Sequence, residues 1–142
     1  MAAYNAPFFS ALTAVFLLYK EKHGEEQALG FMREVFSRRL GPVYDQWGFR
    51  RGNPQDFARV AGKNDRLLGL KVEFLASERG ISYRFYTDPF PGLKGKVDHR
   101  KFDQTYMAFK ISHLLGPEWT SSTPRHLWDG NRFTEHVITR GK

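Results

Sequence analysis

The chain has 142 residues, of which 41% are hydrophobic and 26% charged, and these values fit one folded domain rather than a disordered chain. Its 22 Lys and Arg residues outnumber its 15 Asp and Glu residues, which gives a net charge of +7. The chain has no cysteine, which excludes disulfides, thiolate nucleophiles and cysteine-ligated zinc sites.

The most apolar stretch covers residues 6–19 and is interrupted by Ser10 and Thr13. It is shorter than the roughly 20 apolar residues that a membrane span needs. No lysine or arginine precedes it, so it lacks the positive start of a signal peptide. We therefore predict one cytoplasmic domain over residues 1–142, with no membrane partner.

The three basic doublets, at residues 38–39, 50–51 and 100–101, lie far apart in the sequence, and the chain contains no run of five or more basic residues. Nucleic-acid binders usually concentrate Lys and Arg on one face or along a strip. We therefore interpret the excess as a solvated basic surface that also suits an anionic ligand. Nucleic acid is not the expected partner.

Two helices are predicted at the start of the chain, over residues 6–22 and 25–47. In both, apolar side chains recur at steps of three and four, which places them on one helical face. Gly41-Pro42 predicts a kink or a break in the second helix. The first helix carries more apolar surface than one domain is expected to cover, so a homodimer with residues 6–22 in its interface is also predicted.

A third helix and a β-hairpin follow. Asn53-Pro54, an N-cap residue before a proline, begins a helix that ends near Gly69. Beyond it the period changes to two, and apolar side chains alternate with polar ones over residues 70–76 and again over residues 81–86. This alternation predicts an antiparallel hairpin.

The chain ends with a helix and a second hairpin. An aspartate N-cap predicts the helix over about residues 99–115. Two strands, roughly residues 119–128 and 132–139, are expected to pair across a tight turn at residues 129–131. Pro124 predicts that the first of them is an edge strand or is interrupted. The order ααα-ββ-α-ββ predicts an α+β fold, an antiparallel sheet with helices packed on one face.

Candidate functional residues lie in the second half of the chain. Asp88-Pro89 ends a strand with a carboxylate, a common place for functional groups, although Asp before Pro is also an ordinary turn starter. His126 and His136 are expected on paired strands, and His113 on the apolar side of the last helix. A histidine on an apolar face is more often a satisfied core residue, and no H-x-x-x-H or H-E-x-x-H spacing occurs. We therefore predict no metal and no cofactor.

The aromatic content points to a ligand site. The chain has 13 Phe, 6 Tyr and 3 Trp, and most of the phenylalanines occupy core-type positions. Rings packed between helices and a sheet can leave a concave apolar cavity, and such cavities with a few polar groups are typical ligand sites. No G-x-S-x-G elbow, P-loop or G-x-G-x-x-G turn is present.

Two short motifs carry a family resemblance. One is Asp88-Pro89 at a strand end, and the other is G-N-R-F-T-E-H at residues 130–136 of the closing hairpin. With the element order, they resemble the L-2-amino-thiazoline-4-carboxylic acid hydrolase-like proteins and the related small-molecule-binding 4-vinyl-reductase domains. In those families the motifs read Cys-Pro and Gly-Asp-x-x-Cys-x-Phe. The resemblance implies an α+β domain with a pocket between helices and sheet.

The resemblance implies the family's architecture for this chain but not the family's cysteine chemistry. Both cysteine positions differ here, one being Asp88 and the other Thr134. A cysteine-dependent hydrolase mechanism therefore cannot operate, although Asp88 could act as a base or as an electrostatic group in its place.

The leading hypothesis is a domain that binds a small, largely apolar ligand with an anionic group. Histidines and Asp88 would orient the ligand's polar atoms, and Trp128 would offer a stacking surface. The side chains expected near this ligand are Tyr86, Asp88, His113, His126, Trp128 and His136.

Two alternatives remain open. The second hypothesis is a non-cysteine hydrolase of a small cyclic or amide substrate, with Asp88 and His136 as its catalytic acid–base pair. It requires Asp88 within hydrogen-bond reach of a histidine, directly or through one water. The third is a nucleic-acid-binding module. It requires that six basic residues converge on one face, namely Arg38, Arg39, Arg50, Arg51, Arg59 and Lys63.

Overall fold

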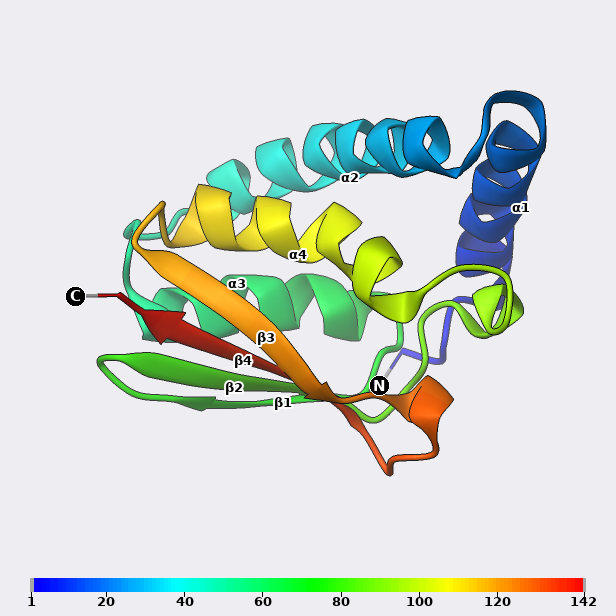
Figure 1. Ribbon diagram of the computed structural model, residues 1–142. Coiled ribbons are helices and arrows are strands. Elements are labelled where there is room, and N and C mark those ends of the chain that lie inside the picture. The colour runs from blue at the N-terminus through cyan, green and yellow to red at the C-terminus, as the bar shows by residue number, and fades with distance from the viewer. Residues whose placement is uncertain (1, 142) are drawn as a thin grey trace.

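The computed structural model describes residues 2–141, which adopt the predicted α+β fold with the predicted order of elements (Figure 1). The α-helices of this part of the chain are α1 (Ala6–His23), α2 (Glu25–Trp47), α3 (Pro54–Leu67) and α4 (His99–Leu114).

The helix starts follow the sequence signals, and one helix interior does not. Asn53 and Asp98 cap α3 and α4, because their Oδ1 atoms accept hydrogen bonds from backbone N–H groups of the first turn at 2.9 and 2.8 Å. The break predicted at Gly41-Pro42 is not found, since α2 continues through it. Pro42 is exposed, so water can replace the hydrogen bond that the carbonyl of Arg38 loses, while the opposite face of α2 packs on α4.

The strands form one antiparallel sheet in the order β1-β2-β4-β3. They are β1 (Val72–Ala76), β2 (Gly80–Phe85), β3 (Trp119–Arg125) and β4 (Thr134–Arg140). Both predicted hairpin pairings are present. Strand β3 lies at an edge, as its proline predicts.

The helices cover one face of the sheet. Helices α3 and α4 lie on the sheet, α2 lies over α4, and α1 stands across one end of these layers (Figure 1). Along β2 the burial alternates, so Ile81, Tyr83 and Phe85 face the helices, whereas Ser82 and Arg84 lie on the open face. The end closed by α1 also holds the short 3-10 helix Pro91–Leu93.

The connection between β3 and β4 differs from the predicted tight turn. Strand β3 stops one residue before His126, a 3-10 helix covers Leu127–Asp129, and the pairing register shifts around Pro124. Proline has no N–H to give to the ladder, which accounts for the shift at this point. His126 therefore lies outside the sheet, and the expectation that it pairs beside His136 is wrong.

Within residues 2–141, no helix is long and apolar enough to cross a membrane. Helix α1 leaves Val15 and Leu18 exposed, at 41% and 54% of their full surface. The homodimer through residues 6–22 stays a prediction.

Candidate functional site

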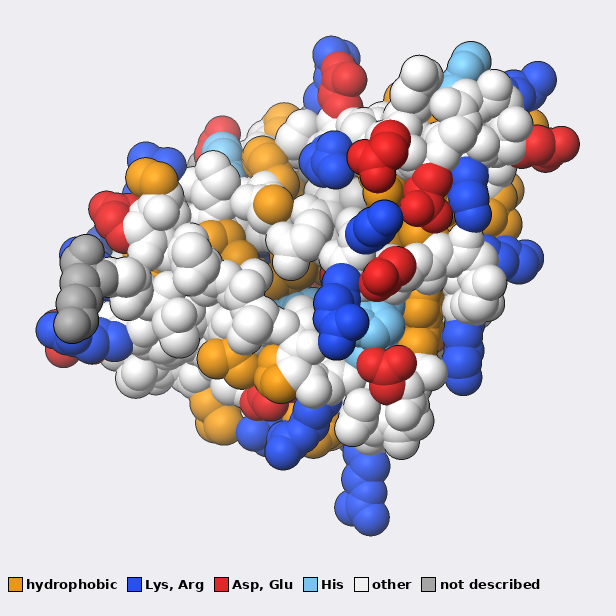
Figure 2. Space-filling model, in the orientation of Figure 1, with side chains coloured by type: hydrophobic (Ala, Val, Ile, Leu, Met, Phe, Trp, Pro, Cys, Tyr) orange, Lys and Arg blue, Asp and Glu red, His pale blue; other side chains and the backbone are white. Residues whose placement is uncertain are grey.

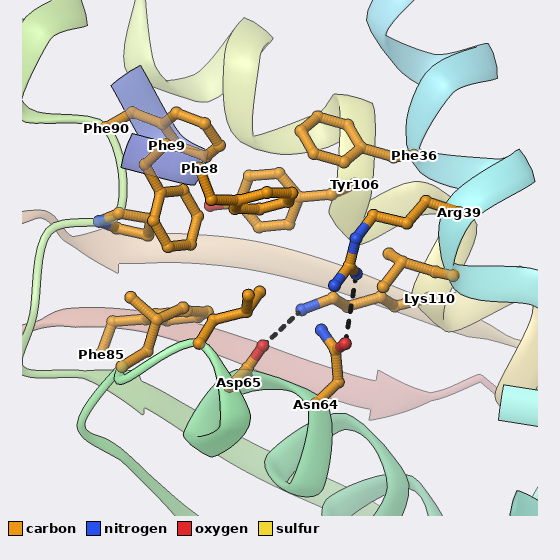
Figure 3. Close-up of a pocket in the computed structure, with 14 residues that line it drawn as sticks. Phe8, Phe9, Phe36, Arg39, Asn64, Asp65, Phe85, Phe90, Tyr106 and Lys110 are labelled. Carbon is orange, nitrogen blue, oxygen red and sulfur yellow. Dashed lines mark hydrogen bonds and ion pairs between the residues drawn. The ribbon is translucent and has the colours of Figure 1, made fainter. Parts of the chain in front are cut away.

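A pocket lies where the first turn of α1 meets α2, α3, α4 and the end of β2 (Figure 3). Its cavity volume is about 40 Å³, which admits a small chemical group or a few waters. Most of its lining is apolar. The rings that line it are Phe8, Phe9, Phe36, Phe85, Phe90 and Tyr106.

Ring contacts and one carboxylate position the aromatic side chains that line the pocket on the α1 side. Phe9 lies edge-on to Phe8 and to Phe90, with centroids 5.1 and 5.3 Å apart, a favourable geometry for aromatic pairs. The Oδ1 atom of Asp88 accepts a hydrogen bond from the backbone N–H of Phe90 at 2.9 Å. The Asp88-Pro89 turn therefore presents Phe90 to the pocket.

A buried ion pair forms the polar floor of the pocket (Figure 3). Lys110 from α4 and Asp65 from α3 approach with Nζ and Oδ1 3.4 Å apart, and both side chains are almost fully buried. The Nζ atom of Lys110 also donates to Tyr83 Oη at 2.9 Å, and the Tyr83 hydroxyl donates to Asp65 Oδ2. The pairing compensates for the cost of taking both charges out of water.

Burial shifts the titration of these groups. It lowers the pKa of Lys110 from its ordinary value, and the charge of Asp65 acts in the opposite direction. Burial also raises the pKa of Tyr83 well above its ordinary value, and the neighbouring Asp65 raises it further. Tyr83 therefore stays a neutral hydroxyl, and Lys110 gives up its proton more readily than an exposed lysine does.

Arg39 supplies a second cation at the pocket. Its guanidinium lies 4.9 Å from the centroid of the Phe8 ring, and Nη1 donates to Asn64 Oδ1 at 3.2 Å. None of the carboxylates in residues 2–141 forms an ion pair with it. Arg39 is thus a half-buried cation held by an amide and a ring rather than by an anion.

A smaller compartment lies behind the pocket, and the two share Phe85, Phe90 and Tyr106 as their dividing wall. Its central carboxylate is Asp103 of α4, which accepts hydrogen bonds from Tyr106 Oη and from the Nε2 atom of His126, both at 3.0 Å. Burial and the adjacent Asp103 raise the pKa of Tyr106 well above its ordinary value. Each carboxylate oxygen of Asp103 thus already accepts one hydrogen bond.

The tautomer of His126 follows from its contacts. Its Nδ1 atom accepts a hydrogen bond from the backbone N–H of Trp128 at 3.0 Å, so this nitrogen carries no proton. The proton is then on Nε2, which donates to Asp103. Trp128 in turn donates from Nε1 to Asp88 Oδ2 at 2.7 Å. The compartment is thus a continuous hydrogen-bond chain from α4 to the loop after β2.

Asp103 and His126 of this compartment, together with the neighbouring His99, are three groups that could hold a metal ion, each with one ligand atom within 4.8 Å of the others. The two imidazole rings stack with centroids 3.9 Å apart and planes within 13°. A histidine lone pair lies in the ring plane, so stacked rings do not direct two nitrogens at one ion. Since His126 Nε2 also carries a proton, this arrangement does not fit a metal.

The structure brings together three of the six side chains expected near a ligand. Asp88, His126 and Trp128 line the smaller compartment and are joined by hydrogen bonds. They lie next to the apolar pocket, on the far side of its dividing wall. They do not line its cavity.

Tyr86 and His113 lie elsewhere, which corrects their expected placement. Tyr86 is exposed and donates from Oη to Glu73 at 3.2 Å. The Nε2 atom of His113 lies 2.7 Å from Asp45 Oδ1, near the opposite end of α4 from the compartment. Two features explain these positions: strand β2 ends before Tyr86, and α4 turns a different set of residues inward.

His136 is completely buried on the helix-facing side of β4. Its Nδ1 atom lies 2.8 Å from Thr123 Oγ1, and its Nε2 atom has no hydrogen-bond partner in residues 2–141. Burial lowers its pKa to about 4, so the ring is neutral near pH 7. Asp88 forms no hydrogen bond to this or any other histidine side chain of the described residues, so the direct acid–base pair of the hydrolase hypothesis is not formed.

Three of the six basic residues named for nucleic-acid binding form ion pairs with carboxylates, and the nucleic-acid hypothesis stays a prediction. Arg39 lies at the pocket, Arg38 pairs with Glu34 at 2.7 Å, and Arg50 and Arg59 both flank Asp56. On the face shown in Figure 2, blue basic side chains alternate with red acidic ones and form no continuous patch.

Sequence reasoning missed the residues that line the pocket's polar end, namely Arg39, Asp65 and Lys110. A signal for one of them was available. On α4 the titratable residues His99, Asp103, Tyr106 and Lys110 follow each other at steps of four, three and four, which places them on one helical face. All four are buried, and this is the face that α4 turns inward.

A scan against models of known protein families finds none that matches this chain, and a search of curated proteins finds no match. The resemblance to the L-2-amino-thiazoline-4-carboxylic acid hydrolase-like proteins therefore stays a prediction.

Proposed function

We propose that this protein binds a small molecule with an apolar body and one anionic group. The apolar body would lie against the rings that line the pocket, whose cavity of about 40 Å³ admits only part of it, and the anion would meet Arg39. One observation carries this proposal: Arg39 is a half-buried cation at the pocket without a carboxylate partner among the described residues.

The charges that line the pocket favour a single negative charge on the ligand. Lys110 and Asp65 neutralise each other, so the positive charge of Arg39 remains. Partial burial lowers the effective dielectric constant around Arg39, so its charge attracts an anion more strongly than that of an arginine at the surface. A monoanion therefore complements the pocket better than a neutral or a cationic molecule.

Arg39 also has hydrogen-bond donors without a partner. A guanidinium carries five N–H groups, and one of them is used, toward Asn64. Contact with Phe8 and Asn64 holds the plane of the guanidinium in place, which reduces the entropy lost when a carboxylate binds. Charge-assisted bonds of this kind are roughly twice as strong as neutral ones.

The test uses two ligands of the same shape, phenylacetate and its neutral amide phenylacetamide. Binding is measured by chemical-shift titration of the ¹⁵N-labelled protein. We expect phenylacetate to bind more tightly, and Arg39→Gln to weaken phenylacetate by about tenfold while leaving phenylacetamide unchanged.

The matched control is Arg38→Gln, which removes the neighbouring exposed arginine and the same net charge. It should leave both affinities as they are. Equal weakening by the two variants would mean that the effect comes from overall charge, and no preference for phenylacetate in the unmodified protein would contradict the proposal.

A further inference from the structure

Lys110 has one hydrogen-bond donor that its structural contacts do not use. An ammonium group has three N–H donors, and the Nζ atom of Lys110 has two partners, Tyr83 Oη and Asp65 Oδ1. The side chain lines the pocket, and Figure 3 shows its Nζ directed toward Asp65 at the floor. It is a primary amine at the surface of an apolar cavity.

Two physical effects make a lysine nucleophilic near neutral pH, removal of water and a neighbouring cation. Both act on Lys110. Its Nζ lies 5.2 Å from the ring centroids of Tyr83 and Tyr106 and 5.8 Å from that of Phe85, and the residue is 3% exposed. Arg39 lies close enough for its charge to lower the pKa of Lys110 in addition to the effect of burial.

We propose that Lys110 captures an aldehyde or ketone in this pocket as a covalent imine, the carbonyl compound having an apolar body that fits between the rings. The proposal rests on the proposed function for the pocket, and it adds the attachment atom and the ligand's reactive group.

The chemistry is balanced without an external oxidant or reductant. The neutral amine attacks the carbonyl carbon and forms the Nζ–C bond, and both amine hydrogens leave with the carbonyl oxygen as water. The imine then takes up one proton, so the positive charge on Nζ is restored. Asp65, 3.4 Å from Nζ, faces the iminium as it faces the ammonium and stabilises it.

The experiment treats the protein with acetaldehyde, whose two carbons suit the cavity of about 40 Å³, and sodium cyanoborohydride at pH 6, and measures the adducts by intact mass and peptide mapping. At this pH an ordinary lysine is almost entirely protonated. We expect ethyl modification of Lys110, at a rate at least about tenfold above that of Lys101, an exposed lysine of the same helix.

Two variants and one measurement on the unmodified protein complete the test. Lys110→Arg keeps the charge and cannot form the imine, so the fast adduct should vanish, whereas Lys101→Arg should retain it. If Lys110→Arg does not fold, the ratio of rates at Lys110 and Lys101 in the unmodified protein decides. Equal rates at the two lysines, or a fast adduct that persists in folded Lys110→Arg, would overturn the proposal.

The two experiments distinguish a failure of imine formation from a failure of the proposed anion binding. Phenylacetate binding that depends on Arg39, without a fast adduct on Lys110, overturns imine formation alone. A fast Lys110 adduct without phenylacetate binding supports imine formation and contradicts the anion preference. Failure of both measurements contradicts the pocket as a ligand site.

Discussion

The two polar clusters on either side of the wall formed by Phe85, Phe90 and Tyr106 differ in how fully their hydrogen-bonding atoms are used. In the smaller compartment, both oxygens of Asp103 and both nitrogens of His126 have partners. In the pocket, Arg39 uses one of its donors and Lys110 uses two. Both clusters are polar groups in an apolar core, so burial by itself does not separate them.

The two clusters differ in whether they have hydrogen-bond donors without a partner next to a cavity. Buried polar groups in folded proteins are normally satisfied, as the Asp103 cluster is. That cluster joins α4 to the segment between β3 and β4 and behaves as a structural connection. The ligand that we propose for the pocket would use the unused donors beside the cavity.

The largest expected effect tests the floor of the pocket. Lys110→Met leaves Asp65 buried without its cation, so we expect the free energy of unfolding to fall by about 3–5 kcal/mol in urea titrations. Adding Asp65→Asn should restore part of the loss, because the lone charge is gone. The exposed pair of Arg38 with Glu34 is the control, and Arg38→Gln should cost less than about 1 kcal/mol. A loss below that value in Lys110→Met would contradict the structural role of the pair.

A somewhat smaller effect concerns pH. The pKa of His136 is about 4 in the folded protein and near 6.5 when the chain is unfolded. The unfolded chain therefore binds the proton first, so this contribution to stability is complete above pH 6.5 and is lost as the pH falls toward 4, by about 3 kcal/mol. His136→Phe should flatten the pH dependence of the urea midpoint in this window. An unchanged slope would show that other groups cause it.

The next effect tests the satisfied cluster. Asp103→Asn replaces an acceptor oxygen by an amide that cannot accept from both Tyr106 and His126. We expect a loss of about 1–3 kcal/mol in urea titrations, with unchanged phenylacetate affinity. A change in affinity as large as that caused by Arg39→Gln would mean that the two clusters act as one site.

The smallest expected change in stability, that of Arg39→Gln, distinguishes the pocket most clearly from the Asp103 cluster. Arg39→Gln removes a cation without an anionic partner, so stability should change by no more than about 0.5 kcal/mol while phenylacetate binding falls. Thermal unfolding and the titration of ligand are measured on the same sample. A loss of stability comparable to that of Asp103→Asn would place Arg39 among the structural groups.

The sequence predicted part of the site because some residues carry a local signal. Asp88-Pro89 marks a strand end, and the turn-rich segment that holds His126 and Trp128 marks a loop, where polar side chains commonly gather. Arg39 and Asp65 carry no such signal, and Lys110 carries only the helical spacing of titratable residues along α4. Each lies on a helix with many charged residues, and a charged helical residue is usually solvated.

The sequence by itself determined the class of fold and the order of its elements. Apolar spacing of three and four along α1 to α4, and of two along β1 and β2, is a local property that burial of one face enforces. The tertiary structure alone decided which charges are buried, because that depends on how α2, α3 and α4 meet over the sheet. It also took His126 out of its predicted strand, since the capping hydrogen bonds of a 3-10 turn replaced the strand pairing that Pro124 interrupts.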